Sequence, residues 1–247
     1  MFNRILATAI VAGALAGVFV FSAHMVKVVP LIQAAEVYEN RDQTPALAPH
    51  SSEHADTHHH NESHDTALTK PEAHSHGEDE WSPDEGLERA FYTLLTDLIM
   101  GVGFCLMLTA IIAIRGDEVD WQKGILWGLG AFCAVTAFPA LGLAPEMPGM
   151  QAAALLDRHI WWGATVAASS TGLGLMFLAK NWVFKIAGGA LILIPHIFGA
   201  PHVKLEAGII PVELGSEYAA ATLVITLFFW IVLGSLIGYF YPRLGTK

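Results

Sequence analysis

Histidines are concentrated in one short stretch of this chain, and imidazole is the commonest neutral ligand for late first-row divalent metals. The chain has twelve histidines, and eight of them fall between residues 50 and 76. These eight are His50, His54, His58, His59, His60, His64, His74 and His76. Asp and Glu alternate with them, and no aliphatic run nearby could bury them. The pattern predicts a solvated segment that collects metal ions.

The other four histidines lie in or at the ends of strongly apolar runs. They are His24, His159, His196 and His202. A histidine at a membrane span needs a polar partner or water, so it is a functional-site candidate by default. The alternative is that each caps a helix or lies among lipid headgroups. The topology inferred below brings all four to the outer half of the membrane, which predicts an ordered outer metal site.

The segment from Pro195 to His202 is the sharpest local motif, because each of its two histidines directly follows a proline. Proline removes a backbone donor and breaks a helix, and Gly199 permits a turn. An unwound segment would let His196 and His202 face one cavity, as in the broken helices of transporters. A plain turn at the membrane interface is the alternative.

Asp97 is the only carboxylate well inside an apolar run. An unpaired carboxylate there is costly, so Asp97 should face a cavity, a cation or another polar group. A structural hydrogen bond to a neighbouring helix is the alternative. Met147 and Met150 offer soft thioether ligands in an outer loop, although such methionines also pack against protein or lipid.

Membrane helices must position these residues. The chain has 247 residues, of which 53% are hydrophobic and 15% charged, a composition typical of membrane proteins. A hydrocarbon core needs about 20 apolar residues per crossing helix. Apolar runs of about this length occupy residues 5–29, 91–114, 122–143, 159–179, 183–200 and 218–241. We predict an all-α polytopic membrane protein of six transmembrane helices, in which the short run 183–200 is broken or re-entrant.

The first run also resembles a secretory signal, because Arg4 precedes an apolar stretch. Five spans remain if it is cleaved. We favour an uncleaved anchor, because no good cleavage site follows. The predicted organisation is a first transmembrane helix over residues 1–36, an acidic histidine-rich loop over 37–86 and a five-helix membrane domain over 87–247. The loop lacks apolar periodicity, so we predict that it is disordered.

Charge is distributed unevenly along the chain. Residues 36–89 hold fourteen carboxylates against three basic residues, whereas the whole chain has a net charge of −10. No basic stripe exists to neutralise phosphates, so nucleic acid is excluded as a partner. With the N-terminus inside, the cytoplasmic side receives Arg4, Arg115, Lys123, Lys180, Lys185, Arg243 and Lys247. The other side receives Lys27, Arg41, Lys70, Arg89, Arg158 and Lys204, three of them spread through the long acidic loop. This bias predicts cytoplasmic termini and a periplasmic histidine loop.

Motifs for catalysis are absent from the sequence. It contains no GxxxxGK[ST] loop, no GxSxG element and no HExxH zinc protease signature. We therefore expect no enzyme and no organic cofactor. Ten glycines of the apolar runs are predicted to be helix-packing sites: Gly13, Gly17, Gly101, Gly103, Gly172, Gly174, Gly188, Gly189, Gly234 and Gly238.

Several segments together resemble a known family. They are the opening "RILATAIVAGALAGVFVFSAHMVKVVPLIQAAEVYE", the loop "ALGLAPEMPGM" followed by "RHIWW", and "IPHIFGAPH" before the final "FWIVLGSLIGYFYPR". They look like the predicted cobalt transporter subunit family CbtA over nearly the whole chain outside the histidine loop. The resemblance implies a bacterial inner-membrane protein that works with a small, single-span, histidine-bearing companion (CbtB). The matching positions are His24, Glu36, Pro195, His196, Gly199, Pro201 and His202.

The sequence as a whole predicts uptake of a divalent transition metal across the inner membrane. Co²⁺ is the expected ion, and Ni²⁺ and Zn²⁺ are the alternatives. The histidine loop would act as an antenna, and the ion would pass to a site built from His24, His196 and His202, with His159 and Glu36. Asp97 would lie further along the path. Two other readings stay open: a metal sensor or storage protein, and a factor that supplies metal to an extracytoplasmic enzyme.

Overall fold

The computed structural model of the chain describes residues 1–43, 86–116, 118–202 and 210–244. All regular structure in these ranges is helical, as predicted. In order, the elements are α1 (Phe2–Ala23), η1 (His24–Val28), α2 (Val29–Gln43), α3 (Leu87–Arg115), α4 (Trp121–Phe132), η2 (Cys133–Ala137), α5 (Phe138–Ala140), α6 (Leu155–Leu178), α7 (Trp182–Phe198) and α8 (Val212–Arg243). The eight histidines of residues 50–76 lie outside the described residues.

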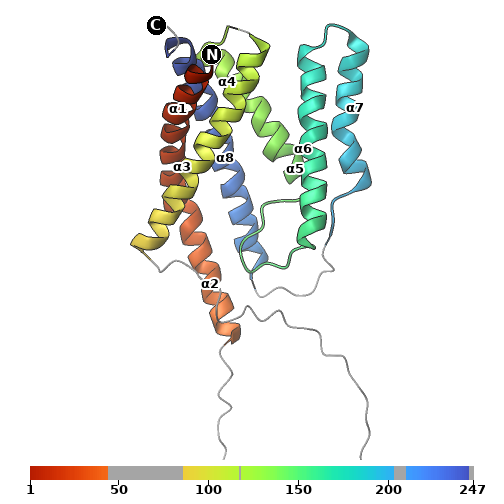
Figure 1. Cartoon of the computed structure of the whole chain (residues 1–247). Helices are drawn as coiled ribbons and strands as arrows, with labels where there is room; N and C mark the ends of the chain where they lie inside the picture. The colour runs from red at the N-terminus through yellow and green to blue at the C-terminus, as the bar shows by residue number, and fades with distance from the viewer. Residues whose placement is uncertain (44–85, 117, 203–209, 245–247) are drawn as a thin grey trace, which may run out of the picture.

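The helices run alternately up and down between two ends of the bundle (Figure 1). The terminal end carries both chain termini and the short α3–α4 and α6–α7 connections. The loop end carries α2, the start of α3, residues 141–154 and residues 199–202. Each of the six predicted apolar runs therefore corresponds to one traverse, and His24, His159, His196 and His202 all belong to the loop-end half.

Four helices are long and apolar enough to cross a membrane by length and composition. They are Phe2–Tyr38, Leu87–Arg115, Trp121–Ala140 and Val212–Arg243, and Trp182–Phe198 is a shorter apolar helix. The 24-residue α6 is not among them, although it is long enough, because its mean hydropathy is lower. The chain is thus a polytopic helical membrane protein, in which α6 and α7 form a less apolar or shorter hairpin beside the four long spans.

Two boundaries differ from the sequence-based prediction. The first helical rod continues through α2 to Gln43, so it includes the first seven residues, 37–43, of the predicted loop. The run at 183–200 is not broken: α7 is continuous and contains both Pro195 and His196 in its last turn. It ends only at Gly199, which has φ +81°. The expected unwound segment is therefore wrong for the first Pro–His pair: α7 continues through Pro195 without an amide bond from that residue and ends where the Gly199 amide donates to the Pro195 carbonyl.

Glycines bring three antiparallel helix pairs into backbone contact. A Cβ on Gly13 of α1 would lie 2.5 Å from the Cα of Val102 of α3, and one on Gly172 of α6 would lie 2.6 Å from the carbonyl oxygen of Gly188 of α7. In the α4–α8 pair, a Cβ on Gly124 would clash with the carbonyl oxygen of Gly234. Such contacts favour helix association in a bilayer, where no hydrophobic effect drives it.

The packing role predicted for the glycines is confirmed for seven positions. They are Gly13, Gly17, Gly101, Gly172, Gly188, Gly234 and Gly238. The prediction is wrong for Gly103, Gly174 and Gly189, where an added Cβ would meet nothing within 4 Å in the part of the chain that the structure describes. Those three face away from the described helices, which the linear sequence cannot reveal.

The core lies between α1, α3 and α8. Trp230 and Leu233 of α8 are fully buried there against Ala9, Ala12 and Ile112 of α1 and α3. The α6–α7 hairpin contacts this core assembly mainly through η2 and α5, and Figure 1 shows it set to one side. The α1–α3–α8 group is therefore the structural centre of the protein.

Two π-helical turns, η1 and η2, interrupt the first and third traverses, and a proline follows each by two residues. In η1 the amide of Val29 bonds to the carbonyl of His24, and in η2 the amide of Phe138 bonds to that of Cys133. Pro30 and Pro139 have no N–H and their rings crowd the carbonyl four residues earlier, so the helix widens just before them.

Replacing a glycine by alanine should destabilise the protein where the glycine contacts a neighbouring helix, but not where it makes no close contact. Gly124→Ala puts a Cβ into the backbone of α8, and we expect it to destabilise the protein by about 1–3 kcal/mol or more. Gly130→Ala in the same helix meets nothing within 4 Å, so it should leave stability unchanged or raise it by up to about 1 kcal/mol. Thermal unfolding of the purified variants in detergent checks this. Equal melting temperatures for the two variants would contradict the glycine contact.

Candidate functional site

His24 and Asp97 form a polar pair between α1 and α3. The Nδ1 atom of His24 lies 3.1 Å from Oδ2 of Asp97. The Asp97 side chain is 11% exposed and that of His24 25% exposed, so both groups are largely withdrawn from the surface. Asp97 was predicted to need a cavity, a cation or a polar partner, and the structure gives it a histidine.

The close approach of the two helices explains why these side chains meet. A Cβ on Gly17 would lie 2.8 Å from the carbonyl oxygen of Asp97, so α1 and α3 touch at that point. Side chains on a helix tilt toward its N-terminus. Because the two helices are antiparallel, Asp97 tilts toward the loop end and His24 tilts back toward Gly17. The imidazole and the carboxylate therefore converge from opposite directions.

A second ion pair lies closer to the loop end. Nη1 of Arg89, in the first turn of α3, donates to Oε1 of Glu36 in α2 at 2.8 Å. Arg89 also lines a cavity of about 270 Å³ with Asp97 and three α3 residues that carry hydroxyl groups, Tyr92, Thr93 and Thr96. The cavity therefore extends from the Arg89–Glu36 pair to Asp97 along one side of α3.

The π-helical turn η1 sets which face of α2 meets α3. Glu36 is twelve residues beyond His24, so in an uninterrupted α-helix the two side chains would point about 120° apart. One π turn absorbs an extra residue, which reduces the offset to about 20°. Both pairs, Glu36 with Arg89 and His24 with Asp97, therefore lie at the interface between the first helical rod and α3.

Other ion pairs of the loop end were not predicted from the sequence. Lys27 of η1 binds Glu217 of α8 with an N–O distance of 2.5 Å, and Arg158 binds Glu146 at 2.6 Å. The three titratable residues of segment 24–36, His24, Lys27 and Glu36, are each paired with a residue of α3 or α8. The prolines that follow the π turns were the only sign in the sequence that the backbone of this segment departs from a regular α-helix.

The remaining histidines lie on the α6–α7 hairpin, away from the His24–Asp97 pair. His159 is exposed in the first turns of α6, and His202 is exposed beyond α7. The His196 ring packs edge-on against Trp161 with centroids 5.7 Å apart, and its Nε2 atom is buried without a hydrogen-bond partner in the described part of the chain.

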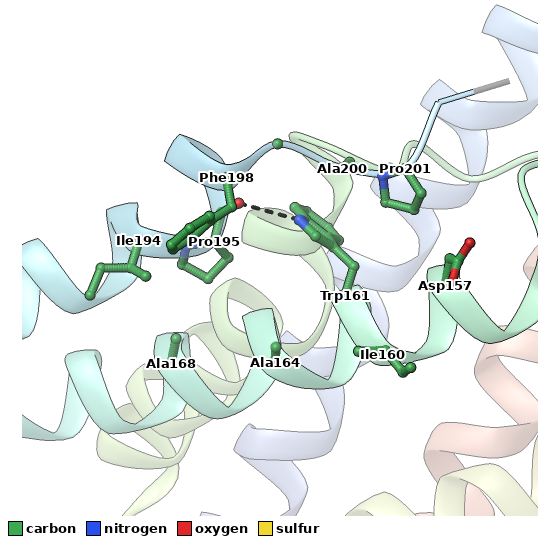
Figure 2. Close-up of a pocket in the computed structure, with 11 residues that line it drawn as sticks. Asp157, Ile160, Trp161, Ala164, Ala168, Ile194, Pro195, Phe198, Ala200 and Pro201 are labelled. Carbon is green, nitrogen blue, oxygen red and sulfur yellow. Dashed lines mark hydrogen bonds between the residues drawn. The ribbon is translucent and has the colours of Figure 1, made fainter. Parts of the chain in front are cut away.

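The groove between α6 and α7 is apolar. Figure 2 shows Ile160, Ala164 and Ala168 of α6 facing Ile194 and Phe198 of α7, with the Trp161 indole between them. The indole N–H donates to the carbonyl of Pro195 at 3.2 Å. This groove of about 590 Å³ is lined mainly by apolar side chains, with the Asp157 carboxylate at its edge.

No group of three or more His, Cys, Asp or Glu side chains that could hold a metal is present in residues 1–43, 86–116, 118–202 and 210–244. The structure pairs His24 with Asp97, whereas His159, His196 and His202 lie on α6, on α7 and just beyond α7 and join no such group. Met147 is buried and packs with Leu31, Ala35 and Ile210. This agrees with the alternative stated from the sequence, in which the methionine packs against protein.

A bundle of membrane-length helices with a histidine–carboxylate pair inside it defines the class: a polytopic membrane protein with an intramembrane polar site. The chain belongs to the family of the probable cobalt transporter subunit (CbtA), because the model of that family matches residues 2–242. The resemblance seen in the sequence is therefore confirmed, and membership of this family implies the role of a cobalt transporter subunit. No curated protein and no solved structure matches the chain.

The His24–Asp97 contact predicts a strong non-additivity in stability. His24→Leu leaves the Asp97 carboxylate largely buried without its partner, which should cost about 1–3 kcal/mol. Replacing both residues by leucine removes the orphaned charge, so the double variant should be at least as stable as His24→Leu alone. Thermal or denaturant unfolding of the two single variants and the double variant measures the coupling. Additive losses would show that the two groups do not interact.

Proposed function

We propose that this subunit takes up Co²⁺ across the bacterial inner membrane, and that the ion passes through the His24–Asp97 pair. The single observation that supports this site is the 3.1 Å approach of an imidazole and a carboxylate inside the membrane-spanning bundle of a chain that belongs to a cobalt transporter subunit family. Neutral imidazole nitrogen and carboxylate oxygen are both ligands for divalent first-row metals.

Entry to the site runs through the Arg89–Glu36 pair in this proposal. Arg89 lines the same cavity as Asp97, so its positive charge faces an incoming cation. In this step Glu36 releases the Arg89 guanidinium and binds the ion instead. Arg89 then moves aside, and the ion reaches Asp97. The eight histidines of residues 50–76 act upstream as an antenna, and the exposed His159 and His202 lie at the same end as this entrance.

The charge distribution supports an orientation with both termini in the cytoplasm and the histidine loop in the periplasm. The described basic side chains of the loop end, Lys27, Arg89 and Arg158, are each paired with a carboxylate. The terminal end carries basic residues in very short connections, among them Arg115, Lys123 and Lys180. An excess of basic residues in short loops marks the cytoplasmic side.

Two protein ligands leave most coordination positions of a transition metal to water or to another chain. A small, single-span, histidine-bearing companion subunit is the partner we propose to supply the missing ligands. A weakly held ion is also released more easily, which transport requires. The ligand types do not discriminate strongly between Co²⁺, Ni²⁺ and Zn²⁺, so selectivity must come from geometry or supply. No organic cofactor enters this proposal.

The site variants should separate transport from mere binding. We expect His24→Ala and Asp97→Asn each to lower accumulation of radiolabelled Co²⁺ at least tenfold, in line with the loss of one metal ligand or its partner. Asp157→Asn removes an exposed loop-end carboxylate away from the pair, so it is the matched control and should accumulate Co²⁺ like wild type.

The outcomes of that uptake assay distinguish the alternatives. If wild type binds Co²⁺ but accumulates none, the protein is a sensor, a store or a metallation factor. If His24→Ala transports normally while His196→Ala combined with His202→Ala does not, the path runs through the α6–α7 hairpin instead.

Deleting residues 50–76 tests the antenna separately. An antenna raises the local metal concentration without building the site, so the deletion should lower Co²⁺ uptake at limiting external Co²⁺ and leave it near wild type at saturation. Measured uptake across a Co²⁺ series gives KM and maximal rate. A loss of maximal rate with unchanged KM would place the loop in the transport step itself.

A further inference from the structure

One hydroxyl group in the middle of the described bundle has no explained role. The Oγ1 atom of Thr222 in α8 is buried and has no hydrogen-bond partner among the described residues. Other helical threonines of this chain donate to the carbonyl four residues earlier: Thr8 to Arg4, Thr93 to Arg89 and Thr165 to Trp161, each at 2.8 Å. Thr222 does not use this local partner, so its hydroxyl is turned away from its own helix backbone.

The register between α1 and α8 fixes the level of Thr222. Near the terminal end, Arg4 donates to the carbonyl of Tyr241, and near the loop end, Lys27 binds Glu217. The helices are antiparallel, so interpolation between these two contacts puts Thr222 opposite residues 22–23 of α1. His24 follows directly, and its ring tilts back toward that level.

The register between α3 and α8 gives the same level independently. These helices run parallel, and Phe104 of α3 packs edge-on against Phe229 of α8 with ring centroids 6.2 Å apart. Asp97 lies seven residues before Phe104, and Thr222 lies seven residues before Phe229. Equal steps along parallel helices bring Asp97 and Thr222 to one height.

Thr222 also lies on the face of α8 that meets α1 and α3. Seven residues are close to two helical turns, so Thr222 shares the face of Phe229. Tyr218, one turn earlier, packs against the same core cluster as Phe229, and that cluster contains Val28 of η1 and Cys105 of α3. Thr222 therefore presents an unpaired hydroxyl on the core face of α8, at the level of His24 of α1 and Asp97 of α3.

We propose that Thr222 is a third residue of the ion site and that its hydroxyl oxygen contacts the ion held by His24 and Asp97. This inference rests on the proposed function. A buried hydroxyl without a partner is costly in the empty protein, and an ion gives its oxygen lone pairs a partner. One nitrogen and two oxygens suit Co²⁺ better than the soft Cu⁺ ion, which prefers sulfur, so Thr222 contributes to selectivity as well as to affinity.

The test compares full-length Thr222→Val, which keeps the shape and removes the hydroxyl, with Thr222→Ser, which keeps the hydroxyl. The matched control is Thr165→Val, because Thr165 is fully buried but bonds to its own helix. We expect Thr222→Val to raise the KM for Co²⁺ uptake about tenfold, the usual scale for losing a group that supports a metal. Thr222→Ser and Thr165→Val should stay within about twofold of wild type.

The melting temperature without metal distinguishes an ion-binding role of Thr222 from a purely structural one, because the two roles predict different effects of Thr222→Val. The Thr222 hydroxyl has no hydrogen bond to lose, so the melting temperature of metal-free Thr222→Val should equal or exceed that of wild type. Co²⁺ should raise the melting temperature of wild type more than that of His24→Ala. This extra increase should be smaller in Thr222→Val, in line with its higher KM. His24→Ala keeps the histidine loop, so this difference excludes loop binding.

The possible failures are distinguishable. If wild type shows no uptake, or if His24→Ala matches wild type, the proposed site itself fails and Thr222 fails with it. If His24→Ala abolishes uptake and Thr222→Val matches wild type in KM and in Co²⁺ stabilisation, only the role of Thr222 is overturned. A fall in metal-free stability with an unchanged KM would likewise overturn it and assign Thr222 to packing.

Discussion

The close approach of α1 and α3 is the contact on which the site depends. Gly13 and Gly17 of α1 and Gly101 of α3 carry no side chains, so the two backbones touch. At a normal interhelical distance, a histidine and an aspartate on neighbouring helices would be separated by packing side chains. Because the helices touch and run antiparallel, the tilted side chains of His24 and Asp97 come within hydrogen-bond distance instead.

The π turn η1 adds a second constraint, since it decides which residues follow His24 at that interface. It turns Glu36 toward Arg89, so the Glu36–Arg89 ion pair and the His24–Asp97 pair both lie along α3 rather than facing different sides. The wide turn exists because Pro30 cannot continue the α-helical bonding pattern. A backbone irregularity in the first helix thus aligns the charged groups through which we propose that a cation enters.

The architecture divides the protein into two parts with different character. The α1–α3–α8 core holds the buried polar groups, whereas the α6–α7 hairpin holds an apolar groove and three separated histidines. A transport site must bind an ion and then release it, and the proposed site of one imidazole, one carboxylate and one hydroxyl suits that requirement better than a closed cluster of histidines.

The sequence by itself determined the class of protein, because helices in lipid must be apolar and about 20 residues long, and six such runs are visible in it. It also identified the family and marked His24 and Asp97, since polar groups in apolar runs are rare. Only the tertiary structure decided their partners. The pairing of His24 with Asp97, of Glu36 with Arg89 and of Lys27 with Glu217 spans large separations along the chain. Each pairing depends on helix register and on glycine contacts, which act in three dimensions and leave no local pattern.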